Sequence, residues 1–220
     1  MDKELLEKKT NLLLGIFIAA LIAANLLGSK VTTIFGIVTS VGIFAYPITF
    51  LITDIIEEVR GKKVTKSFIH AGLFALILTL ILVAIGIVMP PASFYQSNEA
   101  YKTIFQNSMR VIIASITAFL ISQYHDIWAF NFLKKKTKKK HLWLRNNLST
   151  SVSQLIDTTI FIFIAFYATT PQYTVIRMIQ MIIPYWTLKV LFAVVDTPLV
   201  YLGVKWIRSD KRKSLTNSKN

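Results

Sequence analysis

One stretch of the chain, FIHAGLFALILTLILVAIGIVM at residues 68–89, is almost entirely apolar and limits what the whole chain can become. About 20 such residues in a helix cross the hydrocarbon core of a bilayer. Further apolar runs are separated by basic clusters, and the sequence is 54% hydrophobic but only 16% charged. Soluble domains are typically about 25% charged. We therefore predict an all-α membrane protein, with residues 1–220 forming a single polytopic domain.

The apolar runs predict six transmembrane helices. The sixth is interrupted by two prolines, and the second carries Pro47, Phe50, Asp54 and Glu57 at a spacing that places them on one helix face. The segment MDKELLEKKTN has no cleavage site after it, so we expect no signal peptide. The predicted spans are residues 12–29, 36–57, 67–89, 107–132, 147–168 and 178–205, followed by a basic tail over 206–220.

The basic residues predict how these helices are oriented. Most of the 25 lysines and arginines fall on one side of the predicted bundle, above all in KKKTKKKHLWLR at 134–145. Because cytoplasmic loops are enriched in lysine and arginine, we place both termini in the cytoplasm. The six spans then divide into two halves of three. The first half starts inside and the second half starts outside, which permits an inverted repeat. The net charge of +14 thus reads as a topology signal and not as a nucleic-acid-binding surface.

A set of polar side chains remains within the predicted spans and needs an explanation, because ionisable groups are costly in lipid. At 1.5 Å per residue, Asp157 lies roughly 15 Å from the inner end of the fifth span, with Gln154 one turn away. We expect the whole set to point inward, to pair or to contact a ligand. The set is Asn25, Asp54, Glu57, Arg110, Gln123, Asp126, Gln154, Asp157, Lys189 and Asp196.

These residues divide into two groups by the role that we expect. Structural or gating ion pairs are expected for Arg110, Asp126 and Asp196, and an ion pair is the alternative role for Lys189. A hydrogen bond between helices is the alternative role for Asn25. The residues expected to bind substrate are Asp157, Gln154, Asp54, Glu57, Gln123, Asn25 and Lys189.

Several classes of function are disfavoured by what the sequence lacks. Cysteine is absent and the three histidines have no ligand spacing, so we expect no metal and no cofactor. No G-x-x-x-x-G-K-[ST] loop is present that would let this chain drive transport with ATP. An intramembrane enzyme would need a nucleophile–base pair or a metal set, so we expect no catalytic residues. A transporter is the favoured class, with a purely structural membrane protein as the alternative.

Four motifs follow one another along the chain: PITFLITDIIEEVRGKK from Pro47, RVIIASITAFLISQYHDIWAFNFLK from Arg110, LWLRNNLSTSVSQLIDTTIFIFIAF from Leu142, and LKV with DTP near the end. Together they resemble the bacterial queuosine precursor transporters, the YhhQ-type or VUT family, over roughly residues 11–207. This resemblance implies an inner-membrane protein that takes up 7-deazaguanine bases for the salvage of tRNA queuosine. The bases are 7-cyano-7-deazaguanine, 7-aminomethyl-7-deazaguanine or queuine.

The chemistry of the residues is compatible with such a substrate. A guanine-like edge presents two adjacent N–H donors that a carboxylate accepts, so we expect Asp157 to bind that edge with Gln154 beside it. Asp54 or Glu57 would complete the site. The expected partners are the small molecule and the lipid bilayer, with a homo-oligomer left open.

Two alternatives remain for the mode of transport. The chain would serve as the substrate-binding subunit of an energy-coupling ATPase transporter, or it would carry another purine-like solute. Proton coupling and facilitated diffusion both stay open for a carrier with a buried carboxylate.

Overall fold

The structure is a computed structural model that describes residues 3–34, 36–136 and 142–209. Most of these residues are helical, and two short strands form one antiparallel hairpin. The elements in chain order are α1 (Lys3–Leu27), β1 (Val31–Ile34), β2 (Ile37–Ser40), the 3₁₀ helix η1 (Val41–Phe44), α2 (Tyr46–Arg60), α3 (Lys62–Val88), α4 (Asn98–Lys136), α5 (Leu142–Phe166) and α6 (Val175–Arg208).

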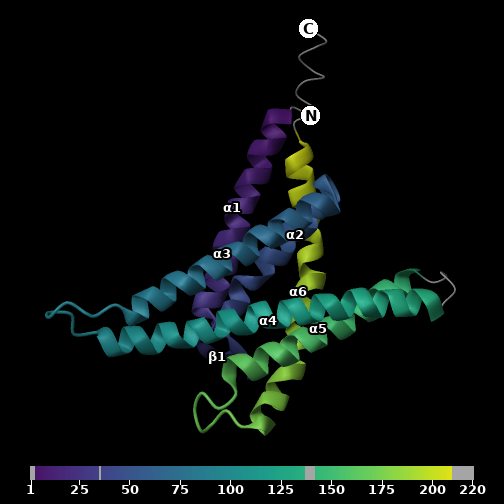
Figure 1. The fold of residues 1–220 in the computed structure, drawn as a ribbon. Coiled ribbons are helices and arrows are strands. Elements are labelled where there is room, and N and C mark those ends of the chain that lie inside the picture. The colour runs from purple at the N-terminus through teal and green to yellow at the C-terminus, as the bar shows by residue number, and fades with distance from the viewer. Residues whose placement is uncertain (1–2, 35, 137–141, 210–220) are drawn as a thin grey trace.

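The helices form two groups that cross each other (Figure 1). The long helices α4 and α5 pack side by side, and α3 packs along α4. In the other group, α2 packs against both α1 and α6. The start of α1 lies beside the end of α6, where Lys9 Nζ donates a hydrogen bond to the Trp206 carbonyl oxygen over 2.8 Å. Both ends of the described chain therefore lie at the same end of the molecule.

Helix α2 is short because both of its boundaries are fixed by local sequence. Pro47 stands in its first turn, where a missing N–H leaves no hydrogen bond unmade. Gly61 ends the helix with φ of 79°, a left-handed conformation that favours glycine, and its N–H donates to the carbonyl oxygens of Ile56 and Glu57. Helix α3 begins at the next residue. The resulting sharp corner fixes α2 and its polar face against α3.

The predicted second transmembrane helix over residues 36–57, which Pro47 interrupts, is wrong in its first part. Residues 31–34 and 37–40 pair as a hairpin, with Ile34 opposite Ile37, and helix α2 begins only at Tyr46. The β-branched residues of VTTI and IVTS favour strands, and Gly36 with φ of 80° supplies the tight turn. Counting apolar residues did not distinguish a partly buried hairpin followed by a helix from one long helix.

Among the described residues, two apolar clusters hold the helices together. One joins α4, α5 and the first half of α6, with Ile43 of η1 at its edge, and Val31, Ile34 and Val38 of the hairpin pack against it. The other joins α1, α2, α3 and the second half of α6, through residues such as Phe17, Ile56 and Ile207. Helix α6 contributes to both clusters, and α3 packs along α4 while belonging to the second cluster, so both helices link the two groups.

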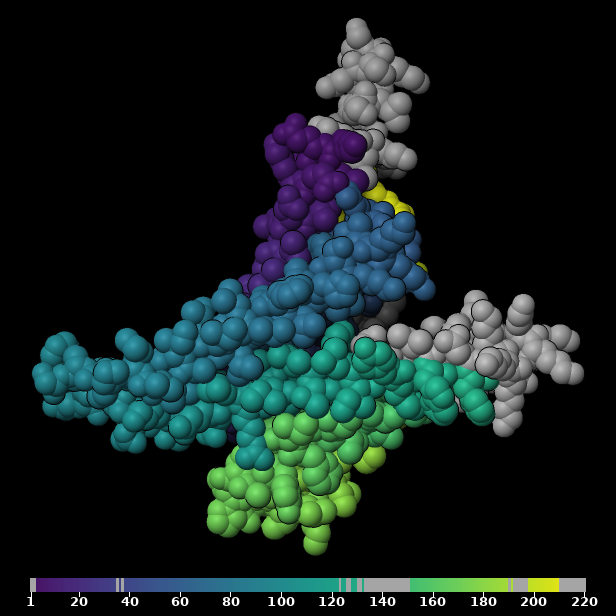
Figure 2. Space-filling view, in the orientation of Figure 1, coloured from purple at the N-terminus to yellow at the C-terminus, as the bar shows by residue number. Residues whose placement is uncertain are grey.

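Helix α3 has the surface of a membrane-spanning segment. Figure 2 shows α3 and α4 projecting together beyond the rest of the molecule. Phe74, Leu82 and Val88 of α3 are 71%, 58% and 82% exposed, which suits contact with lipid. In the described parts of the chain, three helical stretches are long and apolar enough to cross a membrane: Lys3–Leu27, Lys62–Val88 and Asn98–Ser122. Helices overlap the other predicted ranges as well, but six spans stay a prediction.

Candidate functional site

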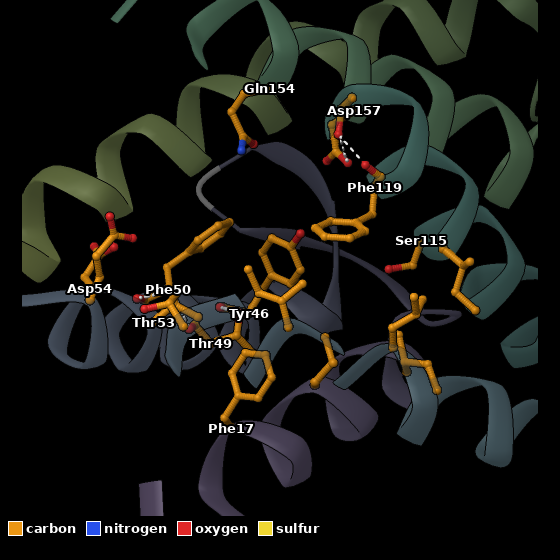
Figure 3. Close-up of a pocket in the computed structure, with 18 residues that line it drawn as sticks. Phe17, Tyr46, Thr49, Phe50, Thr53, Asp54, Ser115, Phe119, Gln154 and Asp157 are labelled. Carbon is orange, nitrogen blue, oxygen red and sulfur yellow. Dashed lines mark hydrogen bonds between the residues drawn. The ribbon is translucent and has the colours of Figure 1, made fainter. Parts of the chain in front are cut away.

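A cavity of about 240 Å³ lies where helices α1 to α5 meet (Figure 3). It is close to the lower end of the range for ligand pockets, about 300–1,000 Å³, so it suits a small ligand. Apolar side chains from α1, α3 and α4 form much of its wall. Its polar lining consists of Tyr46, Thr49, Thr53, Asp54 and Glu57 of α2, Thr65 of α3, Ser115 and Ser122 of α4, and Gln154 and Asp157 of α5.

Asp157 is the buried acid of this cavity, with 9% of the residue exposed. Its two carboxylate oxygens have different partners. Lys189 Nζ of α6 lies 2.8 Å from Oδ2, and the Ser122 hydroxyl donates to Oδ1 over 3.5 Å. The pair with Lys189 gives this end of the cavity a balanced charge, which a buried carboxylate requires.

Lys189 is held by aromatic rings as well as by Asp157. Its ammonium lies 5.2 Å from the centre of the Tyr46 ring and 5.5 Å from that of Tyr185. Both distances are within the range of a cation–π attraction, which is stronger away from water. The ammonium is therefore bound by groups from α2, α5 and α6.

A second, smaller cavity lies beside the first and shares Tyr46, Ser115 and Asp157 with it. Its volume of about 30 Å³ is close to that of one water molecule. Asn25 and Lys189 both line it. The Asn25 amide nitrogen donates to the Leu21 carbonyl oxygen over 2.8 Å. This bond lies within α1, whereas the sequence analysis suggested a bond to another helix.

Arg110 lies away from both cavities, at the end of α5. Its Nε donates to the Ile164 carbonyl oxygen and its Nη2 to the Tyr167 carbonyl oxygen, each over 2.6 Å. These carbonyl groups lack partners in the last turn of a helix, and a cation there is also favoured by the helix dipole. The sequence suggested an acid as the partner of Arg110, whereas the structure gives it two backbone carbonyl groups.

The remaining predicted site residues fall into three sets. Four line the larger cavity: Asp54, Glu57, Gln154 and Asp157. Asn25 and Lys189 line the smaller one, which Asp157 also borders. The side chains of Gln123, Asp126 and Asp196 lie outside what the structure describes. Within the described ranges, no three histidine, aspartate or glutamate side chains gather in a way that would hold a metal ion.

Sequence reasoning missed much of the neutral lining. Phe50, Asp54 and Glu57 of the predicted α2 face do line the cavity, but Pro47 does not. The missed residues are Tyr46, Thr49 and Thr53 of α2, Ser115, Phe119 and Ser122 of α4, and Tyr185 beside Lys189. The three- and four-residue spacing of the missed residues along α2 and along α4 could have indicated that each set shares one helix face.

Comparison with known proteins places the chain among transporters. Residues 40–203 match the family described as "Putative vitamin uptake transporter", a range that contains α2 and the whole of α5 with Asp157. The chain belongs to this family. The resemblance that the four motifs indicated is thereby confirmed, and the protein is a multi-pass membrane transporter rather than an enzyme.

Two relatives are similar over most of their length. A "Probable queuosine precursor transporter" of Bacillus subtilis (strain 168) is 32% identical over 206 residues, which cover 91% of this chain and 88% of that protein. The "Queuosine precursor transporter" of Escherichia coli (strain K12) is 24% identical over 176 residues, 79% of this chain and 76% of that protein. No solved structure matches the chain significantly.

Proposed function

We propose that this chain imports 7-deazaguanine precursors of queuosine across the bacterial cytoplasmic membrane for tRNA modification. The candidate substrates are 7-cyano-7-deazaguanine, 7-aminomethyl-7-deazaguanine and queuine. The names of the two relatives support this substrate class. Within the chain itself, the observation that carries the proposal is the buried Asp157, whose carboxylate borders a cavity of suitable size for a small base.

Asp157 and Gln154 together suit the edge of a guanine-like base. Oδ1 of Asp157 would accept one N–H of the base, and the adjacent N–H would compete with the Lys189 ammonium for Oδ2. The Gln154 amide lines the same cavity and offers both an acceptor and donors. The two carboxylate oxygens and the neighbouring amide match the adjacent donors and acceptors of that edge.

Three aromatic side chains would hold the flat ring. Tyr46, Phe50 and Phe119 lie between the Asp54 side and the Asp157 side of the cavity (Figure 3). Aromatic rings stack on heterocycles in offset or edge-on arrangements and add apolar contact. Such walls select for a planar ligand, while the polar groups at the two sides orient it.

The acids of α2 suit a substituent on the base. Asp54 and Glu57 lie about 12 Å and 16 Å further along the helix axis than Tyr46, at 1.5 Å per residue. Both are exposed and both line the cavity. A cationic aminomethyl arm would therefore extend from the Asp157 end toward these carboxylates, which attract it.

The membrane arrangement belongs to the same proposal. Six spans with both termini in the cytoplasm agree with the adjacent ends of α1 and α6 and with the basic segments of the sequence. The opposite starting sides of the two halves permit an inverted repeat, an arrangement in which the substrate site lies near the bilayer midplane.

Rescue of queuosine tests the function directly. Cells that lack both queuosine synthesis and their own uptake would be given this chain and each of the three precursors in turn. We expect the wild-type chain to restore queuosine in tRNA, and Asp157→Asn to abolish the rescue because the base loses its charged acceptor. Queuosine in tRNA is the measured quantity.

The matched control is Glu99→Gln, which neutralises an exposed acid at the start of α4 that does not line either cavity. This variant should rescue as well as the wild type. Normal rescue by Asp157→Asn, at equal amounts of inserted protein, would reject the assigned role. Uptake by this chain alone would also rule out dependence on an added ATPase module.

A further inference from the structure

Asn25 carries a buried acceptor atom that no described residue satisfies. The residue is 3% exposed and lines the smaller cavity, and its Oδ1 has no hydrogen-bond partner in the described parts of the chain. Exchanging the oxygen and nitrogen of the amide would not help, because Oδ1 would then face the Leu21 carbonyl oxygen. Buried acceptors without a partner are rare in folded proteins, so this atom needs an explanation.

A strong donor lines the same cavity. The Lys189 ammonium has three N–H groups, and one of them donates to Asp157 Oδ2 over 2.8 Å. Asn25 and Lys189 line the same cavity, whose volume of about 30 Å³ is that of one water molecule, and the rotatable bonds of a lysine side chain allow its ammonium to move within such a space. Tyr46 and Tyr185 also line the cavity, so the ammonium would keep both aromatic rings as neighbours.

We propose that Asn25 Oδ1 is a second acceptor for the Lys189 ammonium. The ammonium donates to Asn25 Oδ1 when a bound substrate occupies the carboxylate oxygens of Asp157. This inference rests on the proposed function. A base that donates two N–H groups to Asp157 competes with Lys189 for the carboxylate oxygens. A buried ammonium cannot be left without a partner, and Asn25 Oδ1 supplies one at the moment of exchange. Asn25 is thus a positioning residue that acts through Lys189.

The neighbouring polar groups fit this role less well. The Ser40 hydroxyl also lines the cavity, but it already donates to the Gly28 carbonyl oxygen over 2.7 Å and accepts from the Gly42 N–H over 3.1 Å. A water molecule between Asn25 and Lys189 is the competing explanation. A water would satisfy Asn25 whether or not substrate is bound, so the two explanations differ in how Asn25 affects substrate affinity.

The test is the uptake kinetics of 7-cyano-7-deazaguanine in membrane vesicles at known amounts of inserted protein. Asn25→Leu removes the acceptor, so Lys189 resists displacement and KM should rise about tenfold or more, with a much smaller change in Vmax. Asn25→Ala replaces this variant if the leucine does not insert. Asn25→Asp restores an acceptor, so its KM should be at or below that of the wild type.

Thr158→Val is the matched control. Thr158 lies next to Asp157, is fully buried, and has a hydroxyl without a partner among the described residues, but it does not line either cavity. Its KM should stay at the wild-type value. A KM for Asn25→Leu within twofold of the wild type overturns the inference and favours the water. Failure of the wild type to take up any of the three bases would overturn the proposed function first.

Discussion

At the scale of single residues, Asp157 and Lys189 depend on each other. Their side chains are only 12% and 7% exposed, and their charged atoms lie 2.8 Å apart. Removal of one partner from a buried pair leaves the other charge uncompensated in a medium that solvates it poorly, which is costlier than removal of both. The pair therefore affects stability as well as substrate binding.

Lys189→Met should lower the free energy of unfolding by about 3–5 kcal/mol, because the Asp157 carboxylate loses its counter-charge. The double variant Lys189→Met with Asp157→Asn should recover most of this loss without recovering uptake. Thermal unfolding of the purified protein in detergent measures both effects. Equal stability of the single variant and the wild type would show that the pair contributes little.

The charged site residues could be predicted from the sequence, but most of the neutral ones could not. Asp157 and Lys189 stand out because an ionisable group within an apolar run requires a partner or a cavity. Thr49, Thr53 and Ser115 do not stand out, because small hydroxyl residues are common in membrane helices and can bond to their own backbone. Thr53 does so here, while still lining the cavity.

At the scale of elements, the hairpin is the part of the fold that the sequence analysis missed. It is accommodated because Thr39 and Ser40 are buried in protein and its apolar residues pack against the core of α4, α5 and α6. Non-helical backbone is tolerated at membrane depth where protein or a water-filled cavity surrounds it. A count of apolar residues does not show which segments will pack against a non-helical backbone. Helix α3 could be predicted without this knowledge, because its apolar run is uninterrupted.

Arg110 caps the end of α5 by donating to two backbone carbonyl groups. Replacement by glutamine should lower the free energy of unfolding by about 1–2 kcal/mol, because two charge-assisted hydrogen bonds to partly exposed carbonyl groups are lost. Arg110→Lys should keep part of this stability through its charge near the helix end. Thermal unfolding in detergent measures the difference, and an unchanged Arg110→Gln variant would contradict the capping role.

At the scale of the whole molecule, the larger cavity extends toward the end that holds both chain ends. Asp54 and Glu57 are the exposed members of its lining, and Glu57 is close in sequence to Arg60, which binds Glu7 of α1 over 2.6 Å. Near the opposite end, the Ser108 hydroxyl donates to the Leu26 carbonyl oxygen and ties α4 to α1. With both termini in the cytoplasm, as proposed above, we infer that the structure represents a form open toward the cytoplasm.

Cysteine labelling tests this direction of access, and the natural chain has no cysteine that would interfere. Glu57→Cys should react with a membrane-impermeant maleimide in inside-out vesicles, and bound substrate should slow the reaction. Phe94→Cys, at an 84% exposed position between α3 and α4, is the matched control and should react only in right-side-out vesicles. Equal labelling of Glu57→Cys from both sides would contradict a form open to one side.

The contact between Lys9 and Trp206 has a consequence for protein engineering. Because it holds the first and last helices together, a short linker could join the start of α1 to the end of α6 and make the backbone a closed ring. The ring could then be opened in the exposed segment between Val88 and Asn98, far along the chain from the residues that line the cavities. Such a circular permutant would carry a fused reporter domain on the opposite face of the membrane.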